Sequence, residues 1–76
     1  MDVETLITRS RNRRALPEPR LRRLIRESAR LSQNDVAQVV GVNRSAVSRL
    51  ESGQRTPRDD QIEAYLGVLD RLASER

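Results

Sequence analysis

The spacing of apolar residues along the chain predicts helices and no strands. Apolar positions recur every three to four residues in successive stretches, whereas no stretch alternates apolar and polar residues as a half-buried strand does. The 76 residues are enough for one domain but not for two. The pattern therefore predicts an all-α fold, a compact bundle of four to five helices.

Residues 1–18 are predicted to form a basic arm or a short helix. Three of their apolar residues have helical spacing: Val3, Leu6 and Ile7. Four arginines follow within residues 9–14, and then Pro17 and Pro19 interrupt the pattern, because proline lacks an amide hydrogen. Pro19 can open the next helix. The apolar residues of that helix are expected to form one buried face: Leu21, Leu24, Ile25 and Ala29.

Capping residues delimit two short helices in the middle of the chain. Ser32 and Asp35 have the spacing of a capping box, and Gly41 can close that helix in a left-handed conformation. Asn43 is a good cap for a second helix, over 44–51, which ends near Gly53. Two short helices joined by a tight turn predict a central helix-turn-helix, over 32–51.

A third start signal precedes the last helix. Thr56 can cap it and Pro57 can take its first position, which predicts a long C-terminal helix over 57–74. Residues 19–76 are accordingly predicted to form one domain around the helix-turn-helix.

Composition excludes several classes of protein. The chain has no Cys and no His, and it has no clustered carboxylate pair. We therefore expect no enzyme, no catalytic residue, no metal site, no cofactor and no small-molecule substrate. No apolar run reaches the roughly 18 residues that a membrane span needs, and the acidic N-terminus is unlike a signal peptide. A cytoplasmic protein is expected.

Charge is distributed unevenly. All 15 basic residues are arginine, and the net charge is +4. Residues 1–30 carry nine arginines and four acidic residues, whereas residues 59–76 carry two arginines and five acidic residues. A basic N-terminal part and an acidic C-terminal part suit a protein that turns one end toward a polyanion. Charged residues on solvated helix faces would give the same numbers of basic and acidic residues.

The second helix of the motif has one polar face. At about 100° per residue, four of its side chains fall within about 140°: Arg44, Ser45, Ser48 and Arg49. The apolar residues lie on the other side. An arginine can form paired hydrogen bonds with a guanine edge, and a serine can donate to a base or a phosphate. These four residues are the candidate base contacts.

Residues 31–53, LSQNDVAQVVGVNRSAVSRLESG, closely resemble the lambda repressor and Cro-like (XRE-type) helix-turn-helix family. The resemblance extends over roughly residues 20–66 and implies a DNA-binding domain. It implies a phosphate contact at Gln33, and a loop along the sugar-phosphate backbone that carries Arg55 and Arg58. It also implies an ion pair between Arg26 and Glu51. Asn43 is a further candidate for a backbone contact, beside its capping role.

The function expected is sequence-specific double-stranded DNA binding by a transcriptional regulator, a phage or bacterial repressor or Cro-like protein. Relatives commonly bind palindromic operators as homodimers, and the resemblance implies a homodimer here, at least on DNA. Candidate dimer surfaces are the N-terminal apolar patch and outward residues of the last helix: Val3, Leu6, Ile7, Tyr65, Val68 and Leu72. Alternatively, Leu6 and Ile7 fold back onto the last helix.

Other assignments remain open from the sequence. The fold also serves DNA-binding antitoxins, phage recombination accessory factors and protein-interaction modules that no longer meet DNA. Arginines outside the motif are weaker candidates for backbone contacts, as a flexible arm or on the second helix: Arg9, Arg11, Arg13, Arg14, Arg20, Arg22 and Arg23.

Overall fold

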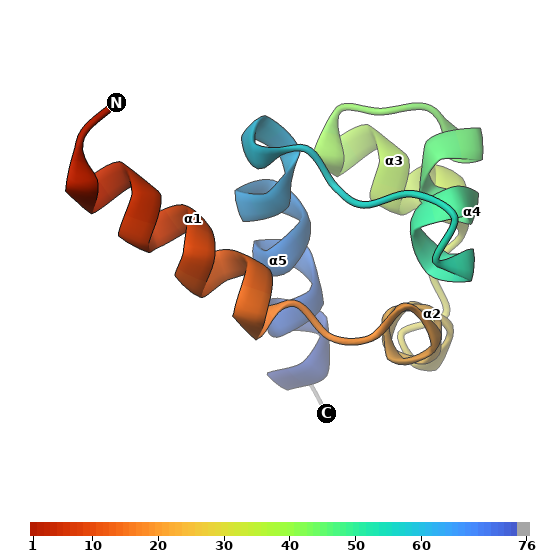
Figure 1. Ribbon diagram of the computed structural model, residues 1–76. Helices are drawn as coiled ribbons and strands as arrows, with labels where there is room; N and C mark the ends of the chain where they lie inside the picture. Colours follow the sequence, from red (N-terminus) through yellow and green to blue (C-terminus); the bar gives the residue numbers. More distant parts are fainter. Residues whose placement is uncertain (75–76) are drawn as a thin grey trace.

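The computed structural model describes residues 1–74, which form five helices and no strand. The helices are α1 (Val3–Ala15), α2 (Pro19–Ser28), α3 (Gln33–Val40), α4 (Arg44–Ser52) and α5 (Asp59–Ser74). Figure 1 shows α5 between α1 on one side and the α3–α4 pair on the other, with α2 next to α4. The predicted all-α bundle with a central helix-turn-helix is confirmed.

The limits of α3 and α4 follow from local hydrogen bonds. The Ser32 hydroxyl accepts from the Asp35 amide at 3.0 Å, and the Asp35 carboxylate accepts from the Ser32 amide at 2.9 Å. These bonds hold the pKa of Asp35 below its usual value. Asn43 Oδ1 accepts from the Ala46 amide at 2.8 Å. Gly41, at φ 83°, closes α3 in the left-handed conformation that glycine adopts without steric penalty.

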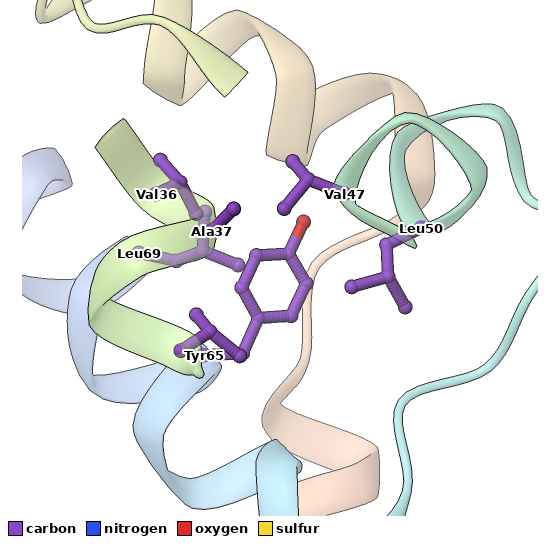
Figure 2. Packing of buried hydrophobic residues seen from close by; sticks show 7 residues of the cluster. Val36, Ala37, Val47, Leu50, Tyr65 and Leu69 are labelled. Atoms are coloured by element: carbon purple, nitrogen blue, oxygen red, sulfur yellow. The ribbon is translucent and has the colours of Figure 1, made fainter. Parts of the chain in front are cut away.

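The core lies where α3, α4 and α5 meet. Figure 2 shows the Tyr65 ring lying between Ala37 of α3 and Leu50 of α4. Tyr65 is 1% exposed, so its predicted outward position on the last helix is wrong. Because α5 is central, its face with Ile62, Tyr65 and Leu69 is covered by the other helices.

The face of α2 turned toward α4 differs from the prediction. Leu21 and Leu24 are 48% and 52% exposed, whereas Arg22 and Arg26 are buried. The cause is the partner surface, because the end of α4 offers these arginines a carbonyl and a carboxylate instead of apolar groups. Leu21 and Leu24 line a groove of about 410 Å³ beside Leu72.

The start of α5 also differs from the prediction. The carbonyl of Arg58 accepts from the amides of Gln61 and Ile62, at 2.9 and 2.8 Å, so the helix begins at Asp59. Thr56 is exposed and does not cap it, and Pro57 is fully buried in the connecting segment instead. Burial of the proline ring ties this segment to the core and delays the helix by two residues.

The N-terminal segment contains the helix α1, over Val3–Ala15. Asp2 caps α1 by accepting from the Thr5 amide at 2.7 Å. Two arginines of α1 reach the first residue of α5: Arg13 forms a hydrogen-bonded ion pair with Asp59, and Arg9 lies 3.6 Å from the same carboxylate. This polar contact places α1 on α5. The alternative in which Leu6 and Ile7 fold back onto the last helix is wrong, because both are about half exposed.

Candidate nucleic-acid interface

The helix α4 has a buried side and an exposed side. Ala46, Val47 and Leu50 are at most 2% exposed and face the core. The four candidate base contacts are all exposed, on the opposite side of the helix: Arg44, Ser45, Ser48 and Arg49. Within residues 1–74 neither arginine of this set forms an ion pair, so both guanidinium groups are available to an outside partner.

A buried ion pair joins α2 to the end of α4. Arg26 Nε and Nη2 donate to the two carboxylate oxygens of Glu51, at 2.6 and 3.0 Å. The hydrogen bonds with Glu51 raise the pKa of Arg26. Arg26 Nη1 also donates to the Leu31 carbonyl at 2.7 Å, which ties the connection between α2 and α3 to the same pair. Two parallel bonds fix the angle between the groups as well as their distance.

Arg22 holds the same end of α4, one turn earlier on α2. Its Nη1 donates to the Leu50 carbonyl at 2.9 Å, and its Nε donates to the Pro17 carbonyl at 2.7 Å. The last carbonyls of a helix lack partners within the helix, and a cation there also complements the helix dipole. Burial lowers the pKa of Arg22, yet a guanidinium stays protonated in a protein. Arg22 and Arg26 together fix the orientation of α4.

Gln33 and Asn43 lie at the starts of the two helices of the motif. The Gln33 side chain is half-buried, and its Nε2 donates to Glu51 Oε1 at 3.2 Å. Its amide group therefore joins the Arg26–Glu51 pair, which links the start of α3 to the end of α4. Asn43 is exposed, and its Oδ1 is engaged in capping α4.

A family model described as a helix-turn-helix domain matches residues 20–76. The chain belongs to this family. No match was found among curated proteins or among solved structures. Helix-turn-helix domains bind DNA by placing the second helix of the motif in the major groove, and in this chain the second helix is α4. The membership of a DNA-binding helix-turn-helix family that the sequence predicts is confirmed.

The segment between α4 and α5 carries two more candidate residues of the helix-turn-helix domain. Arg58 is exposed and Arg55 is half-buried. The Arg49 carbonyl accepts from the amides of Gln54 and Arg55, at 3.0 and 3.2 Å, so the segment folds back onto the last turn of α4. Both arginines thus belong to the segment that directly follows α4.

Several arginines outside the motif have partners within the protein. Arg22 is buried as described, Arg9 and Arg13 contact Asp59, and Arg23 lies 3.4 Å from Glu27. These contacts count against a role for these arginines in contacting the DNA backbone along a groove. Arg11, Arg14 and Arg20 stay exposed without an ion pair among residues 1–74.

Sequence reasoning missed the role of Arg22. The only signal was its spacing, because Arg22 precedes Arg26 by four residues and so lies on the same helix face. No group of His, Cys, Asp or Glu in residues 1–74 is placed to hold a metal ion. None of the helices in that range is long and apolar enough to cross a membrane.

Proposed function

We propose that this protein is a sequence-specific transcriptional regulator, a repressor or Cro-like protein, that acts on an operator in the bacterial or phage-infected cytoplasm. The observation that carries the proposal is that α4 is held firmly on one side and exposed on the other. Three hydrogen bonds from Arg22 and Arg26 hold its last turn from one side, while its two unpaired arginines lie exposed on the other. A rigid helix with free guanidinium groups suits base reading.

The proposed base contacts are on α4. Arg44 and Arg49 would each pair with the O6 and N7 atoms of a guanine, a contact that contributes about 1 to 3 kcal/mol of discrimination. Ser45 and Ser48 would donate to a neighbouring base or phosphate. A serine side chain is shorter than an arginine side chain, so a base contact from Ser45 or Ser48 requires α4 to lie deep in the groove.

The proposed backbone contacts surround α4. Gln33 occupies the first position of α3, where backbone amides lack helical partners and can hold a phosphate. Asn43 keeps its Nδ2 group for a phosphate while Oδ1 caps α4. Arg55 and Arg58 would follow the sugar-phosphate backbone and set the register without reading sequence.

One short reading helix contacts few base pairs, and we therefore propose that two copies bind a palindromic operator. Two-fold related half-sites lie about 34 Å apart, one turn of the duplex. The test is selection of bound duplexes from a random pool, followed by sequencing. A two-fold symmetric consensus is the expected result, and a pool that stays random after repeated rounds would overturn the proposal.

A salt titration of the selected duplex adds a second criterion. Each phosphate contact releases counterions, so affinity falls steeply with salt. We expect a slope that corresponds to about six or more phosphates per dimer. Failure to bind any duplex at low salt would instead favour a protein-interaction module on the same scaffold.

A further inference from the structure

The helix α1 turns an apolar stripe away from the rest of the protein. Val3, Leu6 and Ile7 are 68%, 53% and 48% exposed. At about 100° per residue, Val3 and Ile7 lie within about 40° of each other, and Leu6 lies about 60° to the other side of Val3. Arg9 and Asn12 are on the opposite side, where they border Asp59 of α5. The stripe therefore has no partner among residues 1–74.

An uncovered stripe is unexpected on a helix of this length. The 13 residues of α1 include no buried side chain. Isolated helices shorter than about 12 to 15 residues are marginal in water. In a protein, a helix of this length gains most of its stability by packing an apolar face against other elements. The contact of α1 with α5 is largely polar, through Arg9, Arg13 and Asp59. A second surface that covers the stripe would supply the missing apolar contact.

The charges beside the stripe indicate what covers it. Glu4 lies in the first turn of α1, while Arg11 and Arg14 lie near its end. None of these three has an ion-pair partner among the described residues. Glu4 also borders the pocket between α1 and α5, together with Arg9 and Glu63. An acidic start and a basic end are complementary to another copy of the same helix in the opposite direction.

The register follows from helical geometry. Glu4 and Arg11 lie within about 20° of each other, on one edge of the stripe. In a two-fold interface, residue i of one copy contacts residue j of the other, and j contacts i. An antiparallel pair centred near Ile7 therefore sets Glu4 of each copy against Arg11 of the other copy, twice.

We propose that a second copy of this chain packs antiparallel on α1, with Ile7 near the two-fold axis and two Glu4–Arg11 ion pairs along one edge of the interface. The proposal deepens the proposed function, on which it rests, because a palindromic operator needs a dimer. Since α1 lies across α5 from α3 and α4, this pairing leaves the exposed face of α4 uncovered (Figure 1).

The contact is small. A stable interface buries about 800 Å² on each partner, and three partly exposed aliphatic side chains fall well short of that area. The dimer is therefore weak in free solution and forms mainly when two copies occupy neighbouring half-sites, where the effective concentration is high. A covalent trap detects such a weak pair without DNA.

The first experiment uses the absence of cysteine from the chain. The full-length variant Ile7→Cys is exposed to a mild oxidant, and disulfide-linked dimer is measured over time. Val39→Cys is the matched control, because Val39 is 67% exposed on α3, far from the proposed axis. We expect Ile7→Cys to form dimer at least about tenfold faster at equal concentration, since its two sulfur atoms face each other. Equal rates would show random collision and overturn the proposal.

The second experiment tests the register by charge reversal in the Ile7→Cys background. Glu4→Arg alone and Arg11→Glu alone each turn two attractive pairs into repulsive ones and should slow the trapping by about tenfold. The double variant restores both pairs with the signs exchanged and should recover the original rate. Trapping that stays slow in the double variant would overturn the antiparallel register.

A change in the stability of α1 cannot explain a recovered trapping rate in the double variant. Arg at the start of a helix and Glu near its end both oppose the helix dipole, so the double variant has the least stable α1 of the set. Circular dichroism of each variant reports that loss directly. Because the trapping needs no duplex, its failure would leave DNA binding by the single copy untouched, and the two proposals can fail separately.

Discussion

Arg22 donates to the Leu50 carbonyl at 2.9 Å, and this bond connects α2 to the last turn of α4. The same guanidinium donates to the Pro17 carbonyl at 2.7 Å. One side chain thereby satisfies two carbonyl groups, one in α4 and one in the connection between α1 and α2. The contact with Leu50 is buried and the contact with Pro17 is partly buried. An unsatisfied polar group is most unfavourable in the interior.

Arg22→Met should lower the free energy of unfolding by about 2 to 3 kcal/mol, because both carbonyls lose a charged donor. Arg22→Lys should recover only part of the loss, since one ammonium cannot reproduce the guanidinium fork. Urea denaturation measures both values. The control is Arg23→Ala, whose side chain is 63% exposed and which should stay within about 0.5 kcal/mol of the parent. Equal losses for Arg22→Met and Arg23→Ala would contradict the structural role of Arg22.

Glu51→Ala should lower the free energy of unfolding by about 3 to 5 kcal/mol, because Arg26 would stay buried without its carboxylate partner. Arg49→Ala is the neighbouring control and should change it by less than about 0.5 kcal/mol. The combined variant Arg26→Met with Glu51→Leu removes both charges and should recover much of the loss. Thermal unfolding in which Arg49→Ala is the less stable single variant would rule out the buried pair as a major contribution.

Arg49→Ala should weaken binding to the selected operator and relax the preference at one base pair, with a loss of about 1 to 3 kcal/mol. Arg58→Ala should instead weaken binding to all duplexes alike and lower the salt slope by about one. Fluorescence anisotropy with operator and scrambled duplexes separates the two effects. A uniform loss for Arg49→Ala would assign that residue to the backbone.

Tyr65 should control unfolding in alkaline solution. Burial raises the pKa of Tyr65 to about 12, so the folded chain holds the phenolic proton more tightly than the unfolded chain does. The resulting stability is complete below about pH 10, where an unfolded tyrosine titrates, and is lost as the pH rises toward 12. Tyr65 is the one tyrosine of the chain, and the chain has no Lys or Cys, the other two side chains that ordinarily titrate between about pH 8 and 11.

Tyr65→Phe provides the comparison. The Tyr65 hydroxyl is buried and has no hydrogen-bond partner among residues 1–74, so its removal should leave stability at pH 7 unchanged or slightly higher. The alkaline loss should disappear in this variant, as followed by circular dichroism from pH 8 to 12. Persistence of the same transition in Tyr65→Phe would show that another group is responsible.

Arg30→Gly should raise the free energy of unfolding by about 0.5 to 1 kcal/mol. Arg30 follows α2 at φ 58°, a left-handed conformation that favours glycine over residues with a Cβ. Arg30→Ala keeps the Cβ and removes the same charge, so it should give no gain. A similar gain in both variants would attribute the effect to charge and not to backbone conformation.

The parts of the fold that could be predicted from the sequence are those set by neighbouring residues. The caps at Ser32 and Asn43 and the glycine that ends α3 each act within four positions, so the limits of both helices follow from local rules. The exposed side of α4 follows equally from helical periodicity.

The features that could not be predicted depend on distant contacts. The pattern of α2 placed Leu21 and Leu24 inside, since periodicity cannot show that the end of α4 offers polar partners to Arg22. Thr56 and Pro57 form a good local start signal, yet burial of Pro57 moves the start of α5 to Asp59. The position of α1 depends on an ion pair that spans 46 residues of sequence.

The inner contacts of α4 are independent of its four exposed side chains, and this separation has a practical consequence. Arg44, Ser45, Ser48 and Arg49 can be exchanged for other residues while the hydrogen bonds from α2 remain in place. A library randomised at these four positions would thus retain a common framework, from which variants with new target sequences can be selected.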